Sequence, residues 1–132
     1  MRRQFLLPEA DREHMDARGQ TWETIIDPAG RWLLVHEFPV PDGYNAKRVI
    51  AAVQIGAGYP DAQLDMVYFH PPLARADGRA IGALSHQLID GKTFQRWSRH
   101  RTGQNPWRPG QDDVASHLIL VEHWLEREFK KG

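Results

Sequence analysis

Apolar residues near the end of the chain recur with the spacing of a helix. Successive positions are four, three and four residues apart, at Val114, Leu118, Val121 and Leu125. This spacing places all of them on one face of an α-helix. Two acidic residues, Asp112 and Asp113, stand at the start, where negative charge stabilises the helix macrodipole. The pattern predicts an amphipathic helix from Asp112 onward that packs one face against a core.

Earlier in the chain, the pattern predicts a short helix followed by four strands. Residues Pro8 to Arg18 favour a helix, because a proline occupies an early position and Gly19 follows as a stop signal. Runs of β-branched, aromatic and other apolar residues between turn signals then predict strands at Thr21–Asp27, Arg31–Phe38, Arg48–Ile55 and Leu64–His70. Four consecutive strands predict an antiparallel meander.

The stretch from Pro71 to Gly110 lacks sustained periodicity. It contains four prolines and five glycines, so we predict that most of it is an irregular surface loop of the kind that often carries function. The whole pattern predicts an α+β fold: an N-terminal helix, a four-stranded antiparallel meander, a long loop and a C-terminal helix, with the helices on one face of the sheet. At 132 residues, we expect a single domain over residues 1–132.

Composition excludes several classes of chemistry. The chain contains no cysteine, which removes disulfides, cysteine-ligated metals and every thiol-based mechanism. Lysine plus arginine and aspartate plus glutamate both total 17, and this balance argues against a nucleic-acid or acidic-lipid partner. The apolar runs are far shorter than the roughly 20 residues that span a bilayer, and the N-terminus lacks the apolar core of a signal peptide. We therefore expect no membrane contact and a cytoplasmic location.

Residues Gly91 to Gly110, which we call the basic segment, concentrate positive charge. They include five lysines or arginines, no acidic residue, and two tryptophans, Trp97 and Trp107. The guanidinium groups are suited to holding a carboxylate or phosphate of a partner. Alternatively, they pair with acidic residues elsewhere in the chain, while the two tryptophans pack at the edge of the core. The sequence leaves both interpretations open.

Seven histidines raise the question of a metal site, which their spacing disfavours. His117 and His123 are six residues apart on a predicted helix, so their side chains differ in direction by about 240°. The histidines of the loops have no carboxylate at ligand spacing, so we expect no metal and no other cofactor. We expect His117 to face the core with a hydrogen-bond partner. Surface positions are expected for His14, His36 and His123.

Two serines lie close to histidines in the sequence. Ser85 precedes His86 directly, and Ser98 lies two residues before His100. A hydroxyl nucleophile and an imidazole base are the parts that a covalent mechanism needs. However, no Gly-x-Ser-x-Gly elbow is present, which argues against a serine hydrolase.

The order of several short motifs resembles the ubiquitin-conjugating enzyme fold over nearly the whole chain. The motifs are Tyr59-Pro60, a strand ending in His70-Pro71, Gly91-Lys92-x-Phe94, and Trp107-x-Pro109 before a helix. The run from Asp90 to Arg101, with the tryptophan motif after it, is similar to bacterial family E of this superfamily. The resemblance implies a role beside a ubiquitin-like protein and an adenylating activating enzyme in bacterial conjugation operons, which also encode a metal-dependent isopeptidase. By family association it also implies a setting in phage defence.

Two positions depart from the superfamily pattern. Pro72 stands where the superfamily has the asparagine credited with stabilising an oxyanion. Phe94 falls at the position of the active cysteine, and an alternative alignment on Gly78 places Ile81 there instead. We prefer Phe94 because it lies 13 residues before Trp107, closer to the short spacing of the superfamily than Ile81 at 26. An aromatic residue in place of the thiol resembles the conjugating-enzyme variants, which bind ubiquitin or assist an active partner without catalysis.

Three hypotheses for function follow. In the first, the protein lacks catalytic activity and positions the ubiquitin-like protein and its activating enzyme through His70, Phe94, Arg96, Trp97, Arg99, Arg101, Trp107 and Arg108. In the second, Ser85 or Ser98 forms an oxyester with the ubiquitin-like protein, with His86 or His100 as base. In the third, the tryptophans and arginines of the basic segment bind nucleic acid, against which the zero net charge argues.

Overall fold

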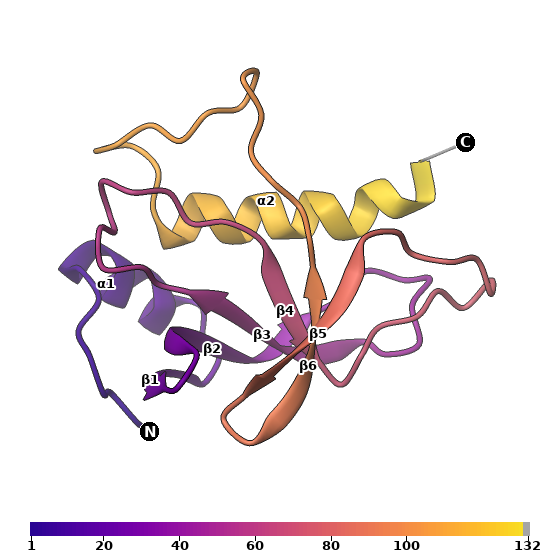
Figure 1. Ribbon diagram of the computed structural model, residues 1–132, viewed down its shortest axis with the longest axis horizontal. Helices are drawn as coiled ribbons and strands as arrows, with labels where there is room; N and C mark the ends of the chain where they lie inside the picture. The colour runs from indigo at the N-terminus through magenta and orange to yellow at the C-terminus, as the bar shows by residue number, and fades with distance from the viewer. Residues whose placement is uncertain (131–132) are drawn as a thin grey trace.

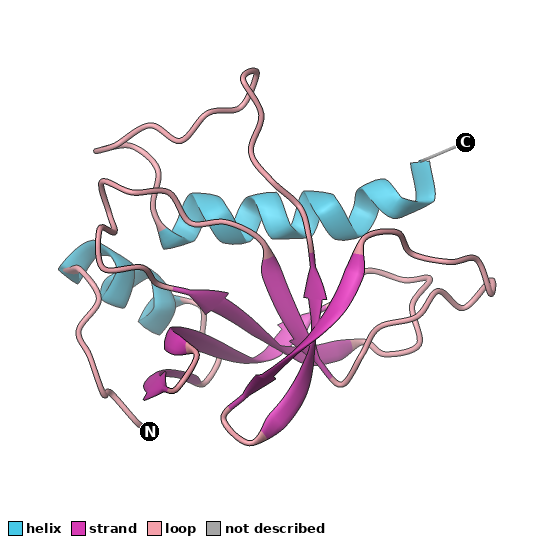
Figure 2. Ribbon diagram, viewed as in Figure 1, coloured by secondary structure: helices cyan, strands magenta, loops and turns pink. Residues whose placement is uncertain are grey.

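Two helices pack against one face of a single six-stranded sheet in the computed structural model, which describes residues 1–130 (Figures 1 and 2). The helices are α1 (Glu9–Ala17) and α2 (Val114–Arg127), the latter followed by a 3-10 turn, η1 (Glu128–Lys130). The strands are β1 (Trp22–Asp27), β2 (Gly30–Pro39), β3 (Arg48–Gln54), β4 (Val67–His70), β5 (Leu84–Ile89) and β6 (Lys92–Trp97). They lie in the order β1-β2-β3-β4-β6-β5, and neighbouring strands are antiparallel. No helix within the described residues is long and apolar enough to cross a bilayer.

The α+β class, both helices and the four-stranded meander are confirmed, but the predicted irregular loop is wrong over residues 84–97. There, β5 and β6 form a hairpin that extends the meander. The turn between them is Asp90-Gly91, and both residues have positive φ, at 52° and 74°. Positive φ at both central positions is the requirement of the tight turn that Asp-Gly favours. This dipeptide was therefore the sequence signal for the missing hairpin.

The sheet buries residues on both faces, so the fold contains two hydrophobic clusters. The larger cluster lies between the sheet and the two helices and includes Val35, Phe69, Trp97 and Leu118. The smaller cluster lies on the other face and consists of Ile25, Trp32, Leu34, Ala52, Tyr68, Ile89 and Phe94. Successive residues of β2 alternate between the two clusters, since side chains along a strand point to opposite faces.

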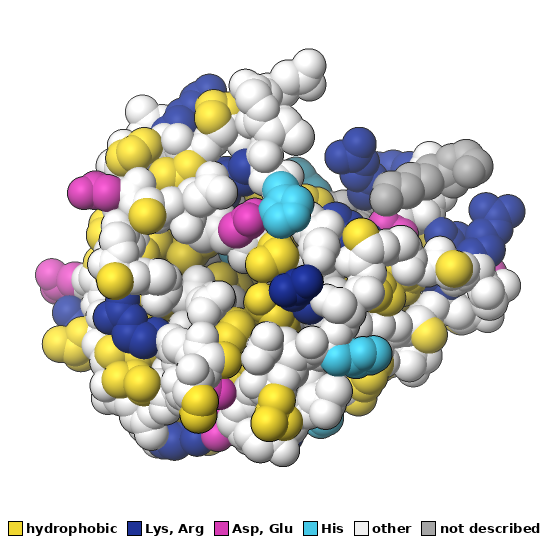
Figure 3. Space-filling view, in the orientation of Figure 1, with side chains coloured by type: hydrophobic (Ala, Val, Ile, Leu, Met, Phe, Trp, Pro, Cys, Tyr) yellow, Lys and Arg dark blue, Asp and Glu magenta, His cyan; other side chains and the backbone are white. Residues whose placement is uncertain are grey.

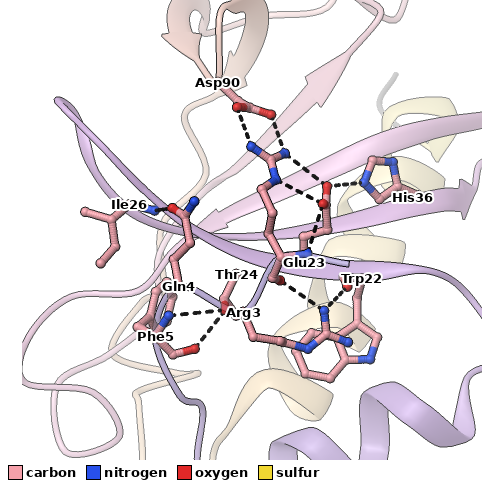
Figure 4. A network of polar contacts seen from close by, with 10 residues as sticks. Arg3, Gln4, Phe5, Trp22, Glu23, Thr24, Ile26, His36 and Asp90 are labelled. Carbon is pink, nitrogen blue, oxygen red and sulfur yellow. Dashed lines mark hydrogen bonds and ion pairs between the residues drawn. The ribbon is translucent and has the colours of Figure 1, made fainter.

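The turn between β5 and β6 lies against the first strand pair at the other end of the sheet. The backbone N–H of Asp90 donates to Asp27 at 3.1 Å. Arg2 donates to both carboxylate oxygens of Glu23 on β1, at 3.0 and 3.1 Å, and to both of Asp90, at 2.8 and 2.7 Å. Figure 4 shows this network, in which His36 also contacts Glu23. The N-terminal residues therefore join the two ends of the sheet and enclose the smaller cluster.

Replacing Arg2 with methionine is expected to loosen this closure. Hydrogen bonds from Arg2, with a smaller contribution from His36, lower the pKa of Glu23 from 4.5 to about 2 against the opposing effect of burial. A carboxyl with a lowered pKa stabilises the fold above its unfolded pKa, and this contribution is lost as the pH falls toward 2. Because the Arg2 side chain is 41% exposed, we expect a loss of only about 1 kcal/mol at pH 7. The variant should also lose less stability than the wild type between pH 4.5 and 2, which urea titrations at several pH values would measure.

Candidate functional site

The segment from Ser98 to Asp113, which we call the connecting segment, joins β6 to α2 and rises beside the start of that helix (Figure 1). It is held from below by the residues that precede β4. The indole N–H of Trp107 donates to the carbonyl of Pro60 at 3.0 Å, and the backbone N–H of Met66 donates to the carbonyl of Arg99 at 3.2 Å. Two segments that are distant in sequence thus form one surface.

Two arginines of this segment are engaged inside the protein. The Arg101 side chain is only 5% exposed, lies 4.8 Å from the centre of the Trp107 ring, and has Asp112 as an ion partner at 3.8 Å. Arg99 is 13% exposed, pairs with Glu128 at 3.3 Å, and lies over the ring of Trp97. For these two residues the structure favours internal pairing over direct contact with a partner.

The other residues expected to bind a partner are scattered. Phe94 and Trp97, predicted as apolar anchors for a partner, are buried in the two hydrophobic clusters, so neither side chain reaches the protein surface in this structure. Because Phe94 lies within β6, it does not take the place of a reactive group on a loop. Ile81 of the alternative alignment lies half-buried in the loop between β4 and β5. Arg96 and Trp107 are half-buried, and Arg108 is exposed.

The His70-Pro71 motif and the connecting segment lie at opposite ends of β4. His70 is the last residue of the strand; its Nδ1 lies 3.0 Å from the carbonyl of Thr93, and its ring packs against Phe94. His100 instead contacts Asp65, two residues before the strand begins. At about 3.3 Å per residue, a four-residue strand separates the two regions by roughly 10 Å or more. The structure therefore does not bring the two predicted parts of the site together.

The serine–histidine pairs are not supported by the geometry. Ser85 and His86 are neighbours on the edge strand β5, so their side chains point to opposite faces of the sheet. Ser98 lies where β6 has just ended, and its backbone N–H donates to the carbonyl of Ala83. Within residues 1–130, no hydrogen bond joins a serine hydroxyl to a histidine ring, and the oxyester hypothesis stays a prediction.

A histidine–carboxylate pair, which sequence reasoning missed, stands at the edge of this surface. His100 Nδ1 lies 2.8 Å from a carboxylate oxygen of Asp65, and the His100 side chain is 61% exposed. The partners are 35 residues apart in sequence, so no local spacing signalled the pair. Beside it lies a pocket of about 230 Å³ lined by Arg99, His100, Trp124, Arg127 and Glu128. Figure 3 shows lysine and arginine side chains gathered on the side of the molecule where α2 ends.

His117 confirms the expectation of a core histidine with a hydrogen-bond partner. It is fully buried on α2, and its Nε2 lies 2.9 Å from the carbonyl of Met66. Burial, with a smaller contribution from the nearby Arg101, lowers the pKa of His117 to about 4, against opposing effects of the Met66 carbonyl and two aspartates. Among the expected surface histidines, His123 is exposed, whereas His14 and His36 are half-buried. The described residues contain no cluster of three side chains suited to a metal ion.

Comparison with known proteins gives one match. A family model described as prokaryotic E2 family E matches residues 7–128, which is nearly the whole chain. No curated protein and no solved structure matches the chain.

Proposed function

Since the chain belongs to prokaryotic E2 family E, we propose that it serves in a bacterial ubiquitin-like conjugation pathway as a binding component that forms no thioester. Its partners in this proposal are a ubiquitin-like protein and the adenylating activating enzyme, which it positions relative to each other in the cytoplasm, in the setting of phage defence. The observation that carries the proposal is the absence of cysteine from a chain of this family, because a thioester needs a thiol.

The surface that we assign to binding is the exposed part of the connecting segment and the adjoining end of α2. Arg108, His100 and Arg127 are exposed there, and Trp107 is half-buried. Arg99 and Arg101 support this surface through their internal ion pairs. A surface with exposed basic groups and a partly buried aromatic residue suits an acidic protein partner, since aromatic and arginine side chains contribute most to interface energies.

The test is reconstitution with the ubiquitin-like protein and the activating enzyme of the same operon, with ATP. The products are separated on denaturing gels with and without reductant and hydroxylamine, and the native mixture is run on a sizing column. We expect no covalent adduct on this chain and co-elution with at least one partner. The Arg108→Gln variant should elute with less partner and show a weaker dependence of affinity on salt. Arg12→Gln, an exposed change on α1, is the matched control.

Two outcomes would contradict the proposal. An adduct that resists reductant but is cleaved by hydroxylamine would identify an oxyester and make the protein an enzyme, as the second hypothesis holds. Absence of both adduct and co-elution would remove the binding role. A double Ser85→Ala and Ser98→Ala variant then distinguishes the proposed serine nucleophiles from any other hydroxyl.

A further inference from the structure

The chain covers one edge of the sheet and leaves the other open. At the β1 edge, Thr24 donates its backbone N–H to the carbonyl of Arg2 at 3.1 Å and accepts from the N–H of Gln4 at 2.9 Å. The side-chain oxygen of Gln4 also accepts from the N–H of Ile26 (Figure 4). At the opposite edge, β5 has no strand on its outer side within residues 1–130.

The register of the β5–β6 hairpin shows which backbone groups of β5 face outward. Ile89 and Lys92, which flank the two-residue turn, are partners, and such a flanking pair exchanges both of its ladder hydrogen bonds. At the other end of the hairpin, the N–H of Ser98 donates to the carbonyl of Ala83 at 3.1 Å, in the same alternation. The odd-numbered residues of β5 thus bond to β6. The even-numbered residues present their N–H and C=O groups at the open edge: Leu84, His86 and Leu88.

β5 also lacks the features that normally keep an edge strand from pairing. Its sequence, Leu-Ser-His-Gln-Leu-Ile, contains no lysine, acidic residue or proline, and its six residues pair with β6 in unbroken register. Within the described residues, one side chain reaches the outward backbone groups: the neutral amide of Gln87 donates to the carbonyl of Leu88 at 3.1 Å. Such a contact is easily exchanged for a backbone hydrogen bond from an added strand.

We propose that β5 pairs in antiparallel orientation with β5 of a second copy of this chain, about a two-fold axis at His86. In this register Leu84 lies opposite Leu88 of the second copy, and Ser85 lies opposite Gln87. Residues with outward backbone groups then face each other, as an antiparallel ladder requires. Leucine meets leucine, neutral polar residues meet neutral polar residues, and like charges are not opposed.

The surroundings of Leu88 favour a second copy of β5 as the occupant. The Leu88 side chain is 63% exposed and lines a groove of about 460 Å³ between the end of β5 and the turn that joins β1 to β2. Leu84 of the second copy covers this leucine, and the two-fold axis repeats the contact at the other end. A strand of another protein would need apolar residues at both ends and a neutral centre, which β5 itself already has.

An interface confined to one six-residue strand is of the size of a transient association. The test is therefore sedimentation of the full chain from micromolar to millimolar concentration, where the average mass should rise from that of one chain toward that of two. Because His86 lies on the axis, His86→Glu and His86→Lys each set two like charges against each other. Each change should weaken dimer formation on the order of tenfold. An equimolar mixture of these two variants should recover the dimer, since opposite charges then meet.

Control variants separate this edge from the rest of the surface. His86→Gln, which remains neutral, should dimerise as the wild type does, and so should His123→Glu, an exposed change on α2. Because the natural chain contains no cysteine, His86→Cys gives an independent readout. Directly paired residues of a ladder lie within disulfide range, so mild oxidation should link two chains of this variant and should not link those of His123→Cys.

Three results would overturn the proposal: a wild-type chain that stays monomeric at millimolar concentration, charged variants that dimerise as well as the wild type, or a mixture of them that fails to recover the dimer. The inference does not depend on the proposed function, because it involves no partner of another sequence. A monomeric protein that still co-elutes with the ubiquitin-like protein would refute the β5 pairing alone.

Discussion

Replacing Phe94 with cysteine is expected to destabilise the protein strongly without creating a thioester-forming site. Phe94 is 1% exposed and belongs to the smaller hydrophobic cluster, where its ring packs against His70. Removing most of a buried phenylalanine costs about 3–5 kcal/mol, because the surrounding residues close the cavity only in part. The new sulfur would lie inside the cluster, out of reach of an acyl donor. Urea unfolding measures the first effect, and non-reducing gels after reaction with the activating enzyme, ATP and ubiquitin-like protein measure the second.

Controls separate these two effects. Phe94→Leu retains much of the buried volume and should lose much less stability than the cysteine variant. Ile81→Cys places a thiol on the loop after His70-Pro71, where the residue is half-buried rather than enclosed. A reductant-sensitive adduct on Phe94→Cys would contradict the core assignment and restore the alignment that puts Phe94 at the thiol position.

Acidification from pH 6.5 to pH 4 is expected to remove about 3 kcal/mol of stability through His117 alone. Burial lowers the pKa of His117 from 6.5 to about 4 in the fold. Between these values the unfolded chain binds a proton at this residue and the folded chain does not, so the free energy of unfolding decreases as the pH falls. Besides burial, Arg101 from the connecting segment lowers this pKa. Asp65 before β4 and Asp112 before α2 raise it, as does the hydrogen bond to Met66. A difference of about 2.5 pKa units between the unfolded and folded states corresponds to about 3 kcal/mol of stability.

The His117→Gln variant isolates this contribution, because glutamine offers a donor for the Met66 carbonyl and does not titrate. Its stability should fall less than that of the wild type between pH 7 and pH 4, and the difference between the two curves should approach 3 kcal/mol. Other groups that titrate in this range, including Asp11, whose pKa is raised by burial, affect both proteins alike. His123→Gln, an exposed change on the same helix, should leave the wild-type curve in place. Parallel curves for His117→Gln and wild type would show that His117 does not titrate as its burial requires.

Local patterns were sufficient to predict both helices and the strands β1 to β4. The spacing of Val114, Leu118, Val121 and Leu125 identified α2, and all four residues are buried. The β1–β2 hairpin followed from two apolar runs around a turn. The hairpin of β5 and β6 was missed because prolines and glycines on either side of it outweighed the Asp90-Gly91 signal. Its strands also carry polar residues, such as Gln95, that are buried with partners in the fold rather than exposed.

The candidate site was harder to predict because its contacts join residues that are distant in sequence. Asp65 and His100 are separated by 35 positions and Arg99 and Glu128 by 29, and nothing local relates either pair. An arginine-rich segment has the same composition whether its charges are paired internally or exposed. Only the fold distinguishes Arg101, which is enclosed, from Arg108, which is exposed. The motif order indicated the family correctly, while the position assigned to the missing thiol required the strand register.

The bond between Arg2 and Asp90 also constrains how the protein assembles during synthesis. The two residues are 88 positions apart, so the closure forms only after the whole meander and the β5–β6 turn have left the ribosome. Contacts of such long sequence separation form late, because the chain between them must first be ordered. The N-terminal residues, which are translated first, are therefore among the last to form their native contacts. A chain truncated before Asp90 would emerge with the smaller cluster open on one side. An exposed apolar surface of this kind binds chaperones and promotes aggregation.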